Sequence, residues 1–210
     1  HSGDMSQDDS RESYLYFADK VKSLGVPIYY VPGNHDDPVL MHELFPMHNI
    51  AAEKHIVRPN WQIVMLNSQK TKAVEGYLDQ SQLNFLEQSL GKYPDLHAIV
   101  VFHHQPLPVG AKWLDNLGLT NAGEFWHVLR NYSNVNTVLF GHVHQEFLGE
   151  INGVRCLSVP STCIQFMRQQ DEFGLENLPP GYRWLDLYSD GTLQTGVRRA
   201  DHYVGVFDKS

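Results

Sequence analysis

The sequence is poor in features that point to several common classes of protein. It has only 2 cysteines in 210 residues, Cys156 and Cys163, and they do not form a CxxC pair. This spacing excludes a zinc ribbon, and the low count excludes a disulfide-rich secreted fold. We interpret the two cysteines as thiols in a reducing compartment and therefore expect a cytoplasmic protein; a disulfide between them is the less favoured alternative.

Long apolar runs and blocks of basic residues are also absent. No apolar stretch approaches the roughly 20 residues of a transmembrane helix, so we expect no membrane partner. The net charge is −8 and Lys and Arg form no cluster, which argues against long nucleic acid as a partner. An anionic substrate would therefore need another source of positive charge. Metal ions are one such source, and the 12 histidines are a first sign of them.

Strand and helix patterns alternate over the first two thirds of the chain. Apolar runs predict buried strands at residues 28–31, 62–67, 98–102 and 135–140. Helical spacing predicts helices after Asp9, through Leu44, after Asp79 and after Asn121. Asp9 with Glu12 and Asn121 with Glu124 have the spacing of capping boxes, and Gly25 ends the first helix.

Hairpin signals dominate the last third. Residues 147–151 and 154–159 are joined by Asn152-Gly153, and residues 182–188 and 192–198 by Asp190-Gly191. No repeat or linker divides the chain. We therefore predict a single domain over residues 1–210, of class α/β (α+β) with mixed sheets, in which ligands collect at the carboxyl ends of strands.

Polar motifs stand near the start of the chain and where three of the predicted strands end. They read Gly3-Asp4, Gly33-Asn34-His35-Asp36, Phe102-His103-His104 and Gly141-His142-Val143-His144. A hydrolytic two-metal centre needs a bridging carboxylate and mixed oxygen and imidazole donors, which Asp4, Asn34, His103, His142 and His144 can supply. His35 is then free to face a substrate and to donate a proton.

No single motif carries this interpretation. A Gly-Asp pair is most often a turn, and Asn-His in a loop is usually solvated. The prediction depends on the order of the motifs: a carboxylate, then Asn-His, then His, then His-x-His. We expect His104 to point away from His103, because neighbouring residues of an extended strand face opposite sides.

In this order the motifs resemble those of the calcineurin-like metallophosphoesterases. Finer features are similar to the class III cyclic nucleotide phosphodiesterases of bacteria: the stretches at residues 3–8, 103–108, 113–115, 121–124, 160–163 and 165–166. The resemblance covers essentially the whole chain. It implies a four-layer αββα sandwich of two mixed sheets flanked by helices.

The resemblance also implies an activity, the hydrolysis of 3′,5′-cyclic AMP to 5′-AMP by a metal-activated hydroxide. Two ions chosen from Fe, Mn, Zn or Co would be bridged by Asp4. Asn34, His103 and His142 would complete one site, and His144 would belong to the other. The residues in contact with the small nucleotide substrate would be Asn34, His35, His103 and His144, with His35 as the catalytic acid. A homodimer is left open.

The sequence departs from the family pattern at two places. The Asp-x-His motif of the family is absent before Gly3, so we expect the first metal site to be weak or empty. We also expect the chain to be N-terminally truncated, without the first strand–helix–strand segment. Gln7 stands where many members have an Asp that orients the catalytic histidine, and it can still hold the imidazole of His35 by a hydrogen bond.

Several alternatives stay open on the sequence alone. The substrate could be another small phosphodiester or a phosphomonoester, because a metal core grips only the phosphoryl group. The chain could also be an inactive fragment of such an enzyme. Trp113 and Phe166 are either core residues or rings that stack on a nucleobase, and we interpret Asn121 as a helix cap.

Overall fold

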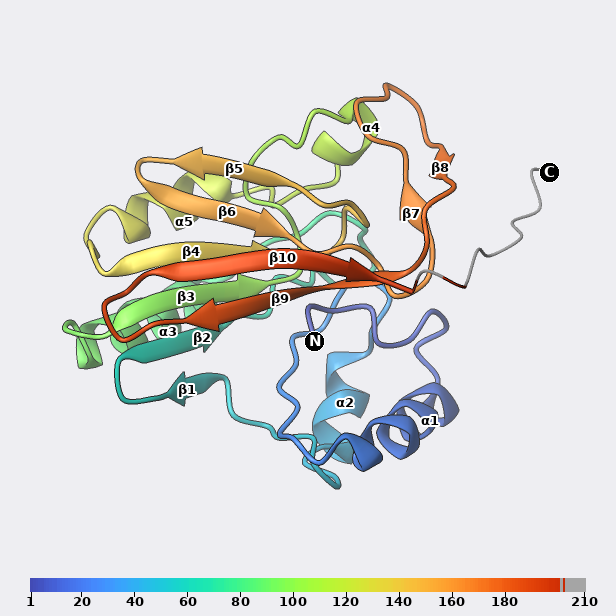
Figure 1. The fold of residues 1–210 in the computed structure, drawn as a ribbon, viewed down its shortest axis with the longest axis horizontal. Helices are drawn as coiled ribbons and strands as arrows, with labels where there is room; N and C mark the ends of the chain where they lie inside the picture. Colours follow the sequence, from blue (N-terminus) through green and yellow to red (C-terminus); the bar gives the residue numbers. More distant parts are fainter. Residues whose placement is uncertain (201, 203–210) are drawn as a thin grey trace.

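A six-stranded mixed sheet forms the centre of the protein. The computed structural model describes residues 1–200 and 202 (Figure 1). The strands lie in the order β1-β2-β3-β4-β6-β5, with β2, β3, β4 and β6 parallel and the two edge strands antiparallel to their neighbours. Their bounds are β1 His55–Val57, β2 Trp61–Met65, β3 His97–Phe102, β4 Val135–Phe140, β5 Leu148–Ile151 and β6 Val154–Ser158.

Two helices cover one face of this sheet, α3 (Gln80–Lys92) and α5 (Ala122–Leu129). Leu83, Leu86 and Leu90 lie on one side of α3 at helical spacing and are all buried. Phe125 of α5 packs edge-on against Phe102 of β3, with ring centroids 4.9 Å apart. The apolar core between helices and sheet holds the parallel strands in place, and with them their carboxyl ends.

An antiparallel ribbon of β9 (Gly181–Leu187) and β10 (Leu193–Arg199) covers the opposite face (Figure 1). Leu185, Leu187 and Leu193 pack against a cluster that includes Trp61 and Ile99. This second β layer faces the first, as a sandwich requires. The Asn152-Gly153 hairpin is also confirmed, since it joins β5 to β6.

A smaller core joins α1 (Arg11–Val21), the 3₁₀ turn η1 (Lys22–Leu24) and α2 (Pro38–Leu44). The predicted helix is confirmed, and it ends at Gly25, whose φ is 67°. The predicted cap is wrong. Ser10, not Asp9, accepts the N–H of Ser13 at 3.2 Å, and Asp9 takes a left-handed φ of 49° in the preceding turn.

The prediction of a regular strand at residues 28–31 is wrong. Ile28 forms an isolated bridge with Ile50. The amino group of His1 donates to the carbonyl of Tyr29 at 2.6 Å, and Val31 donates to the carbonyl of His1 at 3.0 Å. A strand needs a continuous ladder on at least one side, and these segments pair over too few residues to form one.

Besides β1, three short elements escaped prediction: α4 (Lys112–Asp115), β7 (Gln165–Phe166) and β8 (Leu175–Glu176). The last three form one group. They lie together beyond the carboxyl ends of the parallel strands (Figure 1). The N–H of Lys112 donates to the carbonyl of Gln170 at 3.1 Å, which ties α4 to the β7–β8 hairpin. Elements of two to four residues carry too little periodicity to be read from sequence.

Asn121 precedes α5, as predicted, but its side chain does not cap the helix. It exchanges two hydrogen bonds with the backbone of Leu78, accepting at 3.0 Å and donating at 2.7 Å. Cys156 is buried and Cys163 exposed, and both are free thiols, as expected. Within residues 1–200, no helix combines the length and apolar character needed to cross a bilayer.

Candidate metal centre

Side chains from four separate loops meet at the carboxyl ends of β3 and β4. The amide oxygen Oδ1 of Asn34 lies 3.1 Å from Nε2 of His103 and 2.9 Å from Nδ1 of His142. The two imidazole nitrogens are 3.2 Å apart. Oδ2 of Asp4 lies 3.2 Å from the same Nε2 of His103. Sequence analysis selected all four of these residues, and the fold brings them together.

Close backbone approach makes this convergence sterically feasible. A Cβ at Gly33 would overlap the carboxylate of Asp4, and a Cβ at Gly3 would overlap the ring of His103. Oδ1 of Asp4 accepts the N–H of His35 at 3.1 Å, which links the first motif to the second. Glycine is therefore required at both positions.

The backbone at the motifs is held in an uncommon conformation. Asp4, His142 and His144 have φ values of 53°, 61° and 47°, in the left-handed region that residues with a side chain rarely occupy. Strain of this kind concentrates at functional sites, where the surrounding fold over-determines the geometry. It turns these three side chains away from the path of a continuing strand.

Asp36 holds two of the motif loops together. Its buried carboxylate accepts the N–H groups of Gly33 at 2.9 Å, Met5 at 3.1 Å and Ser6 at 3.0 Å. The hydroxyl of Tyr14 donates to it at 3.3 Å. Burial raises the pKa of Asp36, against the effect of these backbone donors. Sequence analysis did not assign Asp36 a role, although it is the last residue of the Gly33-Asn34-His35-Asp36 motif.

The charges in the cluster are coupled. Burial raises the pKa of Asp4, but the charge of His103 and the N–H of His35 outweigh it and hold that pKa below its ordinary value. Burial lowers the pKa of His103, but the carboxylate of Asp4 outweighs it and leaves that pKa raised. Burial lowers the pKa of His142, and it lowers that of His144 to about 4. The last two imidazoles are therefore neutral near pH 7, as metal ligands must be.

Two buried nitrogens of the motif histidines, Nε2 of His142 and Nδ1 of His144, have no hydrogen-bond partner among the described residues. Buried polar atoms are normally satisfied, so orphaned ones need an explanation. The neighbouring donor set combines a carboxylate, an amide oxygen and imidazoles, which suits Mn, Fe, Zn or Co. The residues present therefore fit a bound metal ion.

His144 stands apart from the four converging side chains. No hydrogen bond joins its ring to theirs within the described residues, and the ring instead stacks on Phe166, with centroids 4.2 Å apart and planes at 4°. His35 is exposed beside Asn34, and Nε2 of Gln7 lies 3.2 Å from its Nδ1. The hydrogen bond that we expected between Gln7 and His35 is therefore present.

His104 lies beside the cluster without belonging to it. Its ring is 4.8 Å from that of His142, and its nitrogens could be grouped with those of His103 and His142 as a metal site. Both nitrogens are already used, however. Nδ1 pairs with the hydroxyl of Ser68 at 2.8 Å and Nε2 with the carbonyl of Val74 at 3.0 Å. Burial lowers the pKa of His104 to about 3, so it is a neutral, structural histidine.

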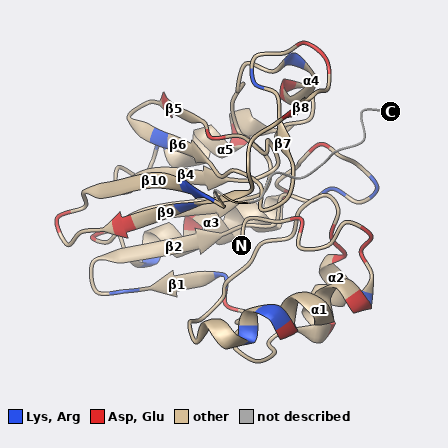
Figure 2. Cartoon of the chain, turned by 45° about the vertical axis from the view of Figure 1, so that its right-hand side comes forward, with Lys and Arg blue, Asp and Glu red and all other residues tan. Residues whose placement is uncertain are grey.

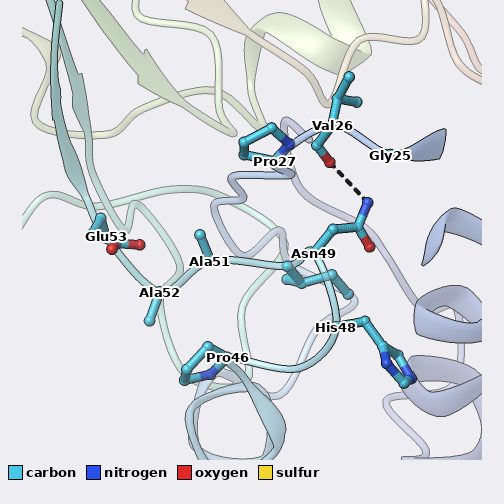
Figure 3. Close-up of a pocket in the computed structure, with 10 residues that line it drawn as sticks. Gly25, Val26, Pro27, Pro46, His48, Asn49, Ala51, Ala52 and Glu53 are labelled. Atoms are coloured by element: carbon cyan, nitrogen blue, oxygen red, sulfur yellow. Dashed lines mark hydrogen bonds between the residues drawn. The ribbon is translucent and has the colours of Figure 1, made fainter. Parts of the chain in front are cut away.

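One surface hollow lies away from this cluster. Residues 25–27, 46 and 48–53 line it, and Figure 3 shows Pro27, Pro46, Ala51 and Ala52 among them. Nδ2 of Asn49 donates to the carbonyl of Val26 at 2.8 Å across one side. None of the motif residues lines this hollow, so it does not extend the candidate centre.

Comparison with known proteins agrees with the geometry. The family model for calcineurin-like phosphoesterases matches residues 1–146. This chain belongs to that family. Membership implies a hydrolase that uses divalent metal ions. The fold of this phosphoesterase is similar to a dimetal phosphatase from Danio rerio (TM-score 0.54, 13% identity, 71% of this chain and 65% of that one). It is also similar to the phosphopantetheinyl hydrolase PptH of Mycobacterium tuberculosis (TM-score 0.51, 14% identity, 76% and 77%).

Similarity in sequence is much higher to a set of bacterial enzymes. The phosphoesterase is 40% identical over 199 residues to the 3′,5′-cyclic adenosine monophosphate phosphodiesterase CpdA of Haemophilus influenzae, which covers 94% of this chain and 73% of the relative. Identity to the enzyme of the same name from Escherichia coli (strain K12) is also 40%, over 94% and 72%. A 3′,5′-cyclic-nucleotide phosphodiesterase of Nostoc is 37% identical over 98% and 77%.

Proposed function

We propose that this phosphoesterase hydrolyses 3′,5′-cyclic AMP to 5′-AMP with the help of bound divalent metal ions. The observation that carries the proposal is the meeting of Asp4, Asn34, His103 and His142, with donor atoms 2.9–3.2 Å apart. The identity to proteins named as cyclic AMP phosphodiesterases supports the choice of substrate.

The roles of the site residues are part of this proposal. Asn34, His103 and His142 would hold one ion together with Asp4, and His144 would serve a second, weaker site that shares Asp4. When bound, such ions supply positive charge to the phosphoryl oxygens and activate the attacking water. Asn34, His103 and His144 also border the space where the phosphoryl group would lie.

His35 is proposed to protonate the leaving oxygen. The side-chain amide of Gln7 contacts Nδ1 of His35 at 3.2 Å and leaves Nε2 of the ring free. In the imidazolium form of the ring, Nε2 would carry the proton that passes to the leaving oxygen, and neutral imidazole would remain. The ring is exposed, so that proton is available to a substrate held beside Asn34. Gln7 would therefore hold the orientation of the acid through its contact with Nδ1.

A substrate panel tests the proposed function. Purified protein with added Mn²⁺ is assayed with cyclic AMP, cyclic GMP, bis(p-nitrophenyl) phosphate and p-nitrophenyl phosphate, and the products are separated by chromatography. We expect cyclic AMP to give 5′-AMP as sole product and the monoester to be a poor substrate. His142→Ala should remove the activity, whereas His127→Gln, an exposed change on α5, should not. Faster turnover of the monoester than of either cyclic nucleotide would contradict the proposal.

A further inference from the structure

The hairpin of β7 and β8 places aromatic rings next to the candidate metal centre. Phe166 at the end of β7 stacks face to face on His144, with ring centroids 4.2 Å apart. The N–H of Phe166 also donates to the carbonyl of His144 at 3.3 Å. The hairpin is thus fixed to the loop that presents His144, and the rings on it are continuous with the site.

Two more rings extend this contact outward. Trp113 of α4 meets Phe166 and Phe173 edge-on, with centroids 5.1 and 5.2 Å away, and the two phenylalanines are 5.5 Å apart. Hydrogen bonds make the arrangement firm: Met167 donates to the carbonyl of Gly174 at 2.8 Å, and the side chain of Gln145 donates to the carbonyl of Met167 at 3.0 Å.

The outer end of this aromatic row is uncovered. Phe173 is 61% exposed and Met167 is 41% exposed. Within the described residues nothing packs over Phe173, although its ring is held from behind by Trp113 and Phe166. An exposed, supported ring at the edge of a phosphoryl-binding site offers a flat apolar surface to the part of a substrate that is not phosphate.

The charge around Phe173 indicates which part of a nucleotide this ring would contact. Asp171 and Glu172 immediately precede Phe173, and both are exposed. The loop next to α4 and β8 is accordingly marked in red in Figure 2. These carboxylates repel a phosphate from the tip of the hairpin but not an uncharged ring. The phosphate therefore belongs at the metal end of the row and the base at the Phe173 end.

We propose that Phe173, backed by Phe166 and Trp113, is the surface on which the base of a cyclic nucleotide stacks. This inference rests on the proposed function and adds to it a residue that selects for the nucleoside part of the substrate. Stacking on an aromatic side chain is tolerant of the base, because every base presents a flat π face. The site then accepts both purine cyclic nucleotides and prefers them to phosphodiesters without a base.

Binding measurements test this inference directly. Calorimetric titration in the presence of EDTA, which prevents turnover of the ligands, compares cyclic AMP with the base-free ribose 3′,5′-cyclic phosphate. The variants are Phe173→Ala, Phe173→Leu and Phe173→Tyr. Tyr188→Ala is the control, since Tyr188 is an exposed ring in the β9–β10 turn, beside Trp61 at the start of β2 and thus at the other end of the sheet.

We expect Phe173→Ala to weaken cyclic AMP binding about 5- to 100-fold and to leave the base-free ligand unchanged. Phe173→Leu should lose most of the same affinity and Phe173→Tyr should keep it, while Tyr188→Ala matches the wild type. Equal binding of cyclic AMP by the wild type and Phe173→Ala would overturn the inference, as would equal wild-type affinity for the two ligands. Failure of the proposed function would give a different result. The protein would then turn over none of the phosphodiesters but would still bind cyclic AMP more tightly than the base-free ligand.

Discussion

In the candidate centre, the side chain of His103 is held by contacts at both of its ring nitrogens. Its Nδ1 lies 2.7 Å from the carbonyl of Ser2 and is the donor in that contact, which directs Nε2 toward Asp4, Asn34 and His142. Without a metal ion, a proton on Nε2 is favoured by the carboxylate of Asp4. A proton and a cation therefore compete for the same nitrogen.

This competition predicts how metal affinity depends on pH. The pKa of His103 is raised above the ordinary histidine value of 6.5, so the ring is largely protonated below pH 6.5. This proton must leave before a cation binds. We expect the affinity for Mn²⁺ to be constant at pH values above the raised pKa of His103 and to fall about tenfold per pH unit below it. Isothermal titrations between pH 5.5 and 8 measure this, and an affinity independent of pH would rule the competition out.

A second prediction at this scale concerns His35. If His35 protonates the leaving oxygen, His35→Ala should slow hydrolysis of cyclic AMP about 10²- to 10⁴-fold, because the ribose oxygen is a poor leaving group. The loss should be under about tenfold for a p-nitrophenyl diester, whose leaving group needs no proton. Gln7→Ala, which removes only the partner of Nδ1, should give a smaller loss with the same selectivity. Equal losses on both substrates would remove His35 from the acid role.

At the scale of elements, the longer strands and helices were predictable and the short ones were not. The strand at residues 98–102 is an unbroken apolar run, the strand at residues 135–140 ends in Val-Leu-Phe, and α3 repeats its leucines at helical spacing. Local pattern and packing therefore agree in these elements. The run at residues 28–31 is equally apolar, but a strand also needs a partner ladder, and sequence shows only one side of that pair.

In the candidate site, too, residues in a local sequence motif were predictable and residues that depend on distant contacts were not. Asn34, His103 and His142 were predictable because each belongs to a polar motif where the chain leaves a buried segment. Asp4 was predictable from its place ahead of them in the order of the motifs. Asp36 and Phe173 were missed for different reasons. The role of Asp36 depends on backbone donors from residues 5 and 6, about 30 positions away. The role of Phe173 depends on a hairpin that has no periodic signal.

The clamp formed by Asp36 leads to a prediction at the same scale. Asp36→Ala leaves the N–H groups of Gly33, Met5 and Ser6 without their acceptor in a buried place. We expect the free energy of unfolding to fall by about 3 kcal/mol, measured by urea denaturation. Asp36→Asn keeps one acceptor oxygen and should cost less. The exposed change Asp171→Ala should stay within about 0.5 kcal/mol of the wild type, and a similar value for Asp36→Ala would mean that the carboxylate does not join the loops.

At the scale of the whole molecule, the centre exists only when the entire sandwich is formed. Its ligand candidates extend from Asp4 to His144, and the parallel order of β3, β4 and β6 is what brings the later motifs to one edge. Metal binding and global folding are therefore coupled, since the unfolded chain cannot offer the same set of donors.

This coupling predicts that metal stabilises the fold. Mn²⁺ at 100 times its dissociation constant should add about 2.7 kcal/mol to the free energy of unfolding and raise Tm accordingly. Asp4→Asn should reduce this gain, whereas His127→Gln, an exposed change on α5, should leave it intact. Elemental analysis after dialysis should find about one tightly held ion per chain. Two fully retained ions would show that the site served by His144 is stronger than we expect.

The left-handed backbone at Asp4, His142 and His144 sets stability against activity. Glycine accepts such torsion angles without steric penalty, so each replacement by glycine relieves conformational tension at the very residues that chemistry needs. Substitutions chosen only to increase the stability of the protein would therefore remove the side chains of this centre. A variant with glycine at one of these positions should therefore lose backbone strain together with a side chain that the centre needs.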